Sequence, residues 1–538
     1  MYLENPELWD IIKKLYIFTF IFSNIVLSNF IFSRILFPIL TLFTHNIKKK
    51  KINIVSSKVN LKQNNFTSDS SINLLVGYDI SNKKHIIIPE SGLYQNFLIT
   101  GTIGSGKTSS SMYPFTKQLL EFNSNNLDKK IGMLILDVKG NFYSQVSKYS
   151  NVLNLNDDLI VLGIDSGVYY NPLHKPHLKP QVLANRLKTI LLLFSENNSE
   201  SFWIDKAEQV ISECIKICRL YNENYVTFSE IHKLVTLPNY LSSKLEVLRN
   251  MFLSSKFNQK ELYDFNISLD FFQKEFNSWD SRTKGIIISE ITRITGVFVS
   301  DYSVSKIFCS SKNALTFTGF DEVINSGKIV VLNMNISEYS DLSKIIATYL
   351  KLDFQSEILS LLSKGICKTT SFICDEFDKF VTKKGAEFFS MSREAKCINI
   401  VSTQSYSSLK STLKDDAYVK VVIQNLINKI WYRTDDIFTI EEAQKQLGKE
   451  EKEKISSSIS ENAKETRFSY ISNTLNSDDS SISETYSKYT QNDFIFETNF
   501  FTQELETFTA LTFLSDGNVI FKPKKILMFP YFKDTITY

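Results

Sequence analysis

The segment best suited to chemistry is GTIGSGKT, residues 101–108. It matches the phosphate-loop pattern G-x-x-x-x-G-K-[ST] at every fixed position. Its glycines allow positive φ angles, so the backbone can bring N–H groups close to phosphate oxygens. An ordinary Gly/Ser turn is the alternative interpretation. We expect a nucleoside triphosphate to be bound by Gly101, Thr102, Ile103, Gly104, Ser105, Gly106, Lys107, Thr108 and Ser109.

Two side chains of this loop have individual roles in the prediction. Lys107 should reach the β- and γ-phosphates as a catalytic cation, and the Thr108 hydroxyl should ligate Mg²⁺. The apolar run 96–100 before the loop predicts a strand, and residues 109–121 after it predict a helix, whose N-terminus favours anions. The predicted cofactors are therefore ATP and Mg²⁺.

An acidic doublet follows a second apolar run, SFIC, as Asp375 and Glu376. Hydrolysis needs one carboxylate for the metal and a second to orient and deprotonate the attacking water. We assign Asp375 to the metal and Glu376 as the general base. A solvated strand end is the alternative for the doublet. Asp137 also ends an apolar run but has no acidic neighbour, so we interpret it as a strand-end residue near the nucleotide.

Arg393 and Gln404 follow the doublet along the chain. An arginine offered across a subunit boundary can stabilise the charge that develops on a transferred phosphoryl group. Gln404, at the tip of the next predicted strand, could sense the γ-phosphate. A surface arginine is the alternative for Arg393.

The elements that must position these residues alternate between strands and helices. Continuous apolar runs are typical of parallel strands covered on both faces. Alternation with helices predicts an α/β fold with a parallel sheet between helical layers. The predicted strands after the loop are 131–137, 159–164, 328–334, 371–375, 397–402 and 427–432, with a long helix over 339–361.

Residues 180–325 have apolar side chains at helical spacing and predict an all-helical insert. Cys214 and Cys218 lie four residues apart within it; we favour core thiols over a metal site. Residues 450–491 are rich in Ser, Glu and Lys and predict a long, partly disordered insertion.

The composition is that of a globular protein of several domains. The chain has 538 residues, 43% of them hydrophobic, and a net charge of +3. There is no global basic excess, so a nucleic-acid partner would need a local patch or a lined channel. The six cysteines lack a paired metal spacing, which is typical of reduced thiols in the cytoplasm.

Residues 15–33 contain no charge over 19 positions, enough for a helix of about 28 Å. We predict a membrane anchor over 1–51, either a single tilted span or a short hairpin, followed by a linker over 52–71. A secretory signal or a soluble core helix are alternatives. The lysines at 48–51 predict that the rest of the chain stays in the cytoplasm, beneath the inner membrane.

With these residues in view, the chain resembles the coupling ATPases of conjugation and type IV secretion, the TraG/TraD group of the FtsK–HerA class. The matching pieces are GTIGSGKT, LDVKGNFYSQ, YYNPL, GKIVVLNM, SFICDEFDKFVT and SREAKCINIVSTQSYSSLK. The sequence departs from the family at Val138 and Asn141, where Pro and Glu are frequent.

The resemblance implies a RecA-like nucleotide-binding domain, here residues 72–179 and 326–538, and a homo-hexameric ring. It implies the same roles for Lys107, Thr108, Asp375, Glu376, Arg393 and Gln404. It also implies relaxase-bound single-stranded DNA, relaxosome proteins and the secretion channel as partners.

We therefore predict a membrane-anchored ATPase that moves DNA or nucleoprotein into a conjugation channel. Two alternatives remain at this point: an FtsK/HerA-like motor for DNA packaging or segregation, and a receptor ATPase for protein secretion.

Overall fold

The computed structural model describes residues 13–17, 19–20, 23, 58–60, 71–194, 201–254, 258–334, 336–462, 467–469, 474–476, 481–532 and 535–537. The chain divides into two units, residues 63–532 and residues 1–62 with 533–538. In the smaller unit, β1 (Lys58–Asn60) pairs antiparallel with β17 (Thr535–Thr537).

The predicted localisation in the membrane is corrected by the structure. A membrane-crossing helix needs about 20 consecutive apolar residues. Within the described ranges, no helix is both long and apolar enough to cross a membrane. Of the segment 15–33, only residues 15–17, 19–20 and 23 are described, and the predicted linker 52–71 is described only at 58–60 and 71.

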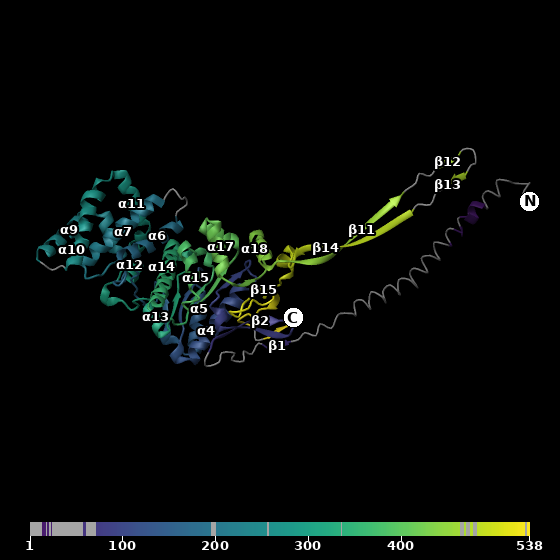
Figure 1. Ribbon diagram of the computed structural model, residues 1–538, viewed down its shortest axis with the longest axis horizontal. Coiled ribbons are helices and arrows are strands. Elements are labelled where there is room, and N and C mark those ends of the chain that lie inside the picture. The colour runs from purple at the N-terminus through teal and green to yellow at the C-terminus, as the bar shows by residue number, and fades with distance from the viewer. Residues whose placement is uncertain are drawn as a thin grey trace, which may run out of the picture. The chain divides into compact units, whose positions relative to one another are not determined.

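An eleven-stranded sheet dominates the larger unit (Figure 1). Its seven strands from β10 to β6 are mutually parallel, while β3, β2, β16 and β15 pair antiparallel at one side. The predicted parallel sheet is thus confirmed, with an antiparallel extension. In spatial order the strands are β3 (Lys84–Pro89), β2 (Asn73–Asp79), β16 (Lys524–Leu527), β15 (Thr509–Phe513), β10 (Asn428–Trp431), β4 (Phe97–Thr100), β9 (Cys397–Thr403), β8 (Thr370–Cys374), β5 (Gly132–Leu136), β7 (Ile329–Leu332) and β6 (Leu159–Leu162).

Both faces of the parallel strands are buried, which explains their continuous apolar sequences. In β4, for example, Leu98 belongs to one core cluster while Phe97 and Ile99 belong to another on the opposite face. The sheet helices are α3 (Glu90–Leu93), α4 (Tyr113–Asn125), α5 (Phe142–Val152), α14 (Ile336–Ser363), α15 (Lys383–Met391), α16 (Tyr406–Leu413), α17 (Asp416–Asn425) and α18 (Ile437–Leu447). Helices α4 and α5 share the core of Phe97, whereas α14 to α17 share that of Leu98.

Helices also fill the segment predicted as an insert. They are α6 (Pro180–Phe194), α7 (Ser201–Tyr221), α8 (Phe228–Thr236), α9 (Pro238–Leu253), α10 (Gln259–Asp270), α11 (Ser281–Val299), α12 (Tyr302–Phe308) and α13 (Phe320–Ser326). Figure 1 shows α7, α9, α10 and α11 grouped together. Cys214 and Cys218 of α7 are buried in this group, and burial raises the pKa of both thiols.

The described part of the segment predicted as a partly disordered insertion contains a long antiparallel hairpin. Strand β11 (Lys449–Asn462) pairs with β14 (Ser481–Phe494) along its whole length, and β12 (Arg467–Ser469) pairs with β13 (Thr474–Asn476) between them. Low hydrophobicity made this segment resemble a disordered one. Pairing satisfies the backbone N–H and C=O groups that face the partner strand, and water can bond to those on the outer edges, so a polar composition does not prevent the hairpin.

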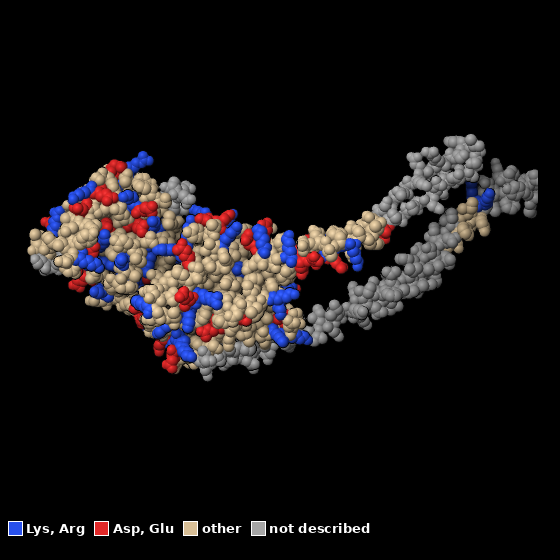
Figure 2. All heavy atoms as spheres, viewed as in Figure 1, with Lys and Arg blue, Asp and Glu red and all other residues tan. Residues whose placement is uncertain are grey.

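Lys/Arg and Asp/Glu side chains are interspersed over the face of the molecule drawn in Figure 2. This distribution agrees with the small net charge of +3. A broad surface of one sign, which would attract a polyanion from a distance, is not visible on that face.

Candidate functional site

Four parallel strands end together at the site. The phosphate loop follows β4, the acidic doublet follows β8, Gln404 follows β9, and the segment 137–141 follows β5. Strand β9 separates β4 from β8 in the sheet. Because the carboxyl ends of parallel strands meet at one edge, segments far apart in sequence line one cavity there.

The phosphate loop has the backbone conformation that its glycines predicted. Gly104 has φ 77° and Gly106 has φ 104°, both in the region that favours glycine. The Thr102 N–H donates to the Arg433 carbonyl at 2.9 Å, and the Ser105 hydroxyl donates to the Thr102 carbonyl at 2.7 Å. A π-helical turn (Thr108–Met112) then leads into α4, so the predicted helix begins with a wider turn.

The side chain of Lys107 folds back onto the first residues of the phosphate loop. Its ammonium group donates to the carbonyl oxygens of Gly101 and Thr102. Burial lowers the pKa of Lys107, and the nearby carboxylate of Asp375 partly opposes that effect. The cation is therefore held within the cavity wall, where an anionic ligand would compensate its desolvation.

The phosphate loop and the acidic doublet meet directly. The Thr108 hydroxyl donates to Asp375 Oδ2 at 2.7 Å. Asp375 Oδ1 accepts from the Ser402 hydroxyl and from the Glu376 N–H. These contacts fix the carboxylate between the carboxyl ends of β4, β8 and β9. Sequence reasoning missed Ser402, since one serine in an apolar strand gives no signal of a partner.

Glu376 occupies a left-handed backbone conformation, with φ 51° and ψ 48°. A residue with a side chain adopts this region at a cost of about 1–2 kcal/mol. Its carboxylate lies at the cavity, where Oε1 is 2.7 Å from Nζ of Lys139. Burial disfavours the charged form of Lys139, but the hydrogen bond to Glu376 and the surrounding carboxylates outweigh it and raise the pKa of Lys139.

Asp137 is a structural cap at the same edge. Its carboxylate accepts the backbone N–H groups of Lys139, Asn141 and Phe142, at the start of α5. Burial and the charge of Asp375 raise the pKa of Asp137, while the three N–H donors oppose the rise. The interpretation of Asp137 as a strand-end residue near the nucleotide fits this position.

The cavity has a volume of about 380 Å³. It is lined by Thr102, Ile103, Gly104, Gly106, Lys107, Thr108, Ser109, Tyr113, Asp137, Lys139, Asn141, Asp375, Glu376, Gln404, Tyr531 and Phe532. Of the predicted residues, Gly101 and Ser105 are part of the loop without lining the cavity. Tyr113, Lys139, Tyr531 and Phe532 were missed; Tyr531 and Phe532 are separated from the loop by most of the chain.

Arg393 is the one predicted site residue that lies away from this cavity. It precedes Cys397, at the amino end of β9, whereas the cavity lies at the carboxyl end. Seven residues of strand separate the two ends, a span of about 20 Å. Arg393 is exposed and donates to the Gly517 carbonyl at 3.5 Å. Arg393 therefore does not line the cavity of the chain that contains it.

The side chains present fit a hydrated Mg²⁺ ion. Mg²⁺ takes oxygen ligands and keeps several waters, so it is commonly held by one or two protein oxygens plus substrate phosphates. Asp375 and Thr108 place a carboxylate and a hydroxyl side by side. Among the described residues, no group of three or more His, Cys, Asp or Glu side chains could hold a metal ion.

Comparisons with known proteins show what the chain is similar to. A family model described as the TraM recognition site of TraD and TraG matches residues 369–493, which include Asp375, Glu376 and Gln404. This match confirms the resemblance to the TraG/TraD group over residues 369–493. Comparison with curated proteins gives no match.

Among solved structures, the bacterial conjugative coupling protein TrwBdeltaN70 in its unbound monoclinic form is 12% identical. The match covers 85% of this chain and 88% of that one, with a TM-score of 0.56. TrwB in complex with ADP and Mg²⁺ is 12% identical over 82% of this chain and 87% of that one, with a TM-score of 0.55. At these identities, the likeness establishes the shared α/β fold with its large parallel sheet.

Proposed function

We propose that this chain is a ring-forming ATPase that drives DNA or nucleoprotein during conjugative transfer. The observation that supports hydrolysis is the 2.7 Å hydrogen bond from Thr108 to Asp375, which joins the phosphate loop to the acidic doublet. The match of residues 369–493 to the TraG/TraD family directs the proposal to conjugation. TrwB, which shares the fold, has been solved with ADP and Mg²⁺, and we propose ATP and Mg²⁺ as the cofactors here.

Each residue has a defined part in the proposed reaction. Lys107 and the N–H groups of the loop hold the phosphates, while Thr108 and Asp375 hold Mg²⁺. Bound Mg²⁺ would neutralise charge on the phosphate oxygens. Glu376 orients the attacking water and accepts its proton. Gln404, at the cavity wall, contacts the terminal phosphate and relays its loss to β9.

We propose that Arg393 acts on the cavity of a neighbouring copy in a hexameric ring. Its distance from its own cavity and its exposure support a role in trans. Mixing tests this: Arg393→Ala subunits retain an intact loop, and Lys107→Ala subunits retain an intact arginine. We expect each variant alone to be inactive and their mixture to recover part of the hydrolysis rate. A mixture as inactive as its components would contradict the proposal.

The function itself is tested by ATP hydrolysis of the full chain with and without single-stranded DNA. We expect DNA to stimulate hydrolysis, and Lys107→Ala to abolish it because the phosphates lose their cation. Lys117→Ala, which removes a partly exposed lysine of α4 paired with Glu121, is a matched control. Stimulation only by protein partners would instead favour a receptor for secreted proteins.

The description of the matching family as a TraM recognition site supports a relaxosome protein as a partner of residues 369–493.

A further inference from the structure

The segment after β16 runs back over the phosphate loop and ends at the cavity. At its start, the Met528 N–H donates to the Phe508 carbonyl at 2.8 Å. At its end, the Tyr531 N–H donates to the Ser109 carbonyl at 2.9 Å. The position of Tyr531 relative to the loop is thus set by backbone hydrogen bonds and not by side-chain packing alone.

Phe508 joins this segment to the centre of the loop. Its N–H donates to the Ser105 carbonyl at 3.2 Å. Its ring lies so close to Gly106 that a Cβ atom added there would be 2.7 Å from Phe508 Cδ1. The loop and the segment after β16 are therefore joined through Phe508, and such support is what a residue that positions a ligand requires.

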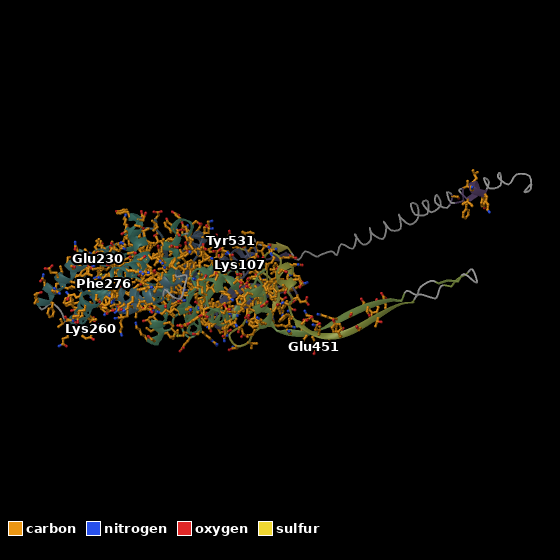
Figure 3. The ribbon with its side chains drawn as sticks, turned by 90° about the horizontal axis from the view of Figure 1, so that it is seen from above. Lys107, Glu230, Lys260, Phe276, Glu451 and Tyr531 are labelled. Carbon is orange, nitrogen blue, oxygen red and sulfur yellow. The ribbon has the colours of Figure 1, made fainter. Side chains whose placement is uncertain are left out.

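Aromatic rings gather where this segment reaches the cavity. Tyr531 packs edge-to-face against Tyr113 and Phe532, with ring centroids 5.2 and 5.4 Å apart. Tyr531 and Phe532 nevertheless remain 47% and 55% exposed, and both line the cavity. Figure 3 shows Tyr531 and Lys107 in the same part of the unit, apart from the insert that contains Glu230 and Phe276.

The proposed positions of the phosphates limit where the rest of a nucleotide can lie. Thr108 contacts Asp375 directly and Lys107 lines the same cavity, so the proposed terminal phosphate and metal belong beside these three side chains. The nucleoside would then extend along the start of the helix, past Ser109. The Tyr531 N–H is hydrogen-bonded to the Ser109 carbonyl at that point. A half-exposed aromatic face at that point suits a nucleobase, because base–aromatic stacking is favourable for every base.

We infer that Tyr531, with Phe532 beside it, is the stacking surface for the nucleobase. This inference rests on the proposed ATPase function and adds a residue that positions the nucleotide in the same site. Stacking recognises the flat face of a base and not its hydrogen-bonding edge. Tyr531 should therefore contribute equally to ATP and GTP binding, and nothing to the binding of a ligand without a base.

The test compares ATP, GTP and inorganic tripolyphosphate binding to the full chain in the presence of Mg²⁺. We expect Tyr531→Ala to weaken both nucleotides roughly ten- to a hundredfold and to leave tripolyphosphate unchanged. Tyr531→Trp should retain nucleotide affinity, and Phe532→Ala should give a smaller loss. Tyr302→Ala, the same change at an 80% exposed tyrosine of α12, is the matched control.

The binding measurements separate the inference about Tyr531 from the proposed function. If Tyr531→Ala binds ATP as tightly as the wild type, the inference is wrong while the proposed function stands. If that variant loses tripolyphosphate as strongly as ATP, Tyr531 supports the loop and does not stack a base. If the wild type binds neither nucleotide, the proposed function falls and the inference with it.

Discussion

Nζ of Lys139 lies 2.7 Å from Oε1 of Glu376, across the cavity edge between the carboxyl ends of β5 and β8. The side chain of Lys139 is 55% exposed and that of Glu376 is 11% exposed. The pair therefore joins a solvent-facing cation to the carboxylate proposed as general base. Two strands that are neighbours in the sheet but distant in sequence supply the two partners.

Lys139→Ala should lower the rate of ATP hydrolysis, because the Glu376 carboxylate loses the partner that fixes its position. A partly exposed ion pair contributes up to about 1 kcal/mol, so the expected fall is up to about fivefold. ATP affinity should change little, and Lys139→Arg should retain the rate. Single-turnover hydrolysis at saturating ATP measures the effect; an unchanged rate would show that the pair does not position Glu376.

Glu376→Gln should bind ATP but hydrolyse it slowly, since an amide cannot accept the proton of the attacking water. Loss of a general base typically costs about 10²–10⁴ in rate. Separate measurements of ATP binding and of hydrolysis check the prediction, with the exposed Glu394→Gln as a control for the same chemical change. Normal turnover in Glu376→Gln would refute its role.

Two glycines of the phosphate loop should respond differently to alanine. Both have positive φ, which costs an alanine about 1–2 kcal/mol. At Gly104 a Cβ would meet no atom within 4 Å, whereas at Gly106 it would meet the Phe508 ring at 2.7 Å. We expect Gly104→Ala to retain measurable nucleotide binding and Gly106→Ala to lose it. Equal affinities in a binding titration would argue against contact between Phe508 and the loop.

Asp353 of α14 is buried between two cations. Lys175 Nζ is 2.8 Å from one carboxylate oxygen and Arg186 Nη1 is 2.6 Å from the other. Asp353→Asn leaves buried positive charge without its partner, and we expect a loss of roughly 3–5 kcal/mol in the free energy of unfolding. Asp416→Asn, which removes the exposed partner of Lys410, should cost under about 1 kcal/mol. Denaturant titration measures both.

The contribution of Asp353 should depend on pH in a defined direction. Burial alone would raise the pKa of Asp353, but the charges of Lys175 and Arg186 outweigh it and lower the pKa below 3.8. A lowered pKa in the folded state stabilises the protein fully above the unfolded value, and this stabilisation is lost as pH falls through the folded value. The difference between wild type and Asp353→Asn should therefore be constant near neutral pH and shrink below about pH 4. A difference that grows on acidification would contradict this assignment.

The sequence by itself determined the parts of the site that are encoded locally. GTIGSGKT specifies the loop conformation through its glycines, and SFICDE places two acids directly after a buried strand. Continuous apolar runs indicated parallel strands covered on both faces, because such strands have no solvent-facing side. Each of these signals lies within about ten residues.

Only the tertiary structure decided which of these segments meet. The bond between Thr108 and Asp375, the ion pair between Lys139 and Glu376, and the arrival of Tyr531 at Ser109 all depend on strand order and on the path of the chain. It also placed Arg393 at the opposite end of β9 from Gln404. Strand order is set by packing among elements distant in sequence. It therefore cannot be predicted from the spacing of motifs along the chain or from local residue types.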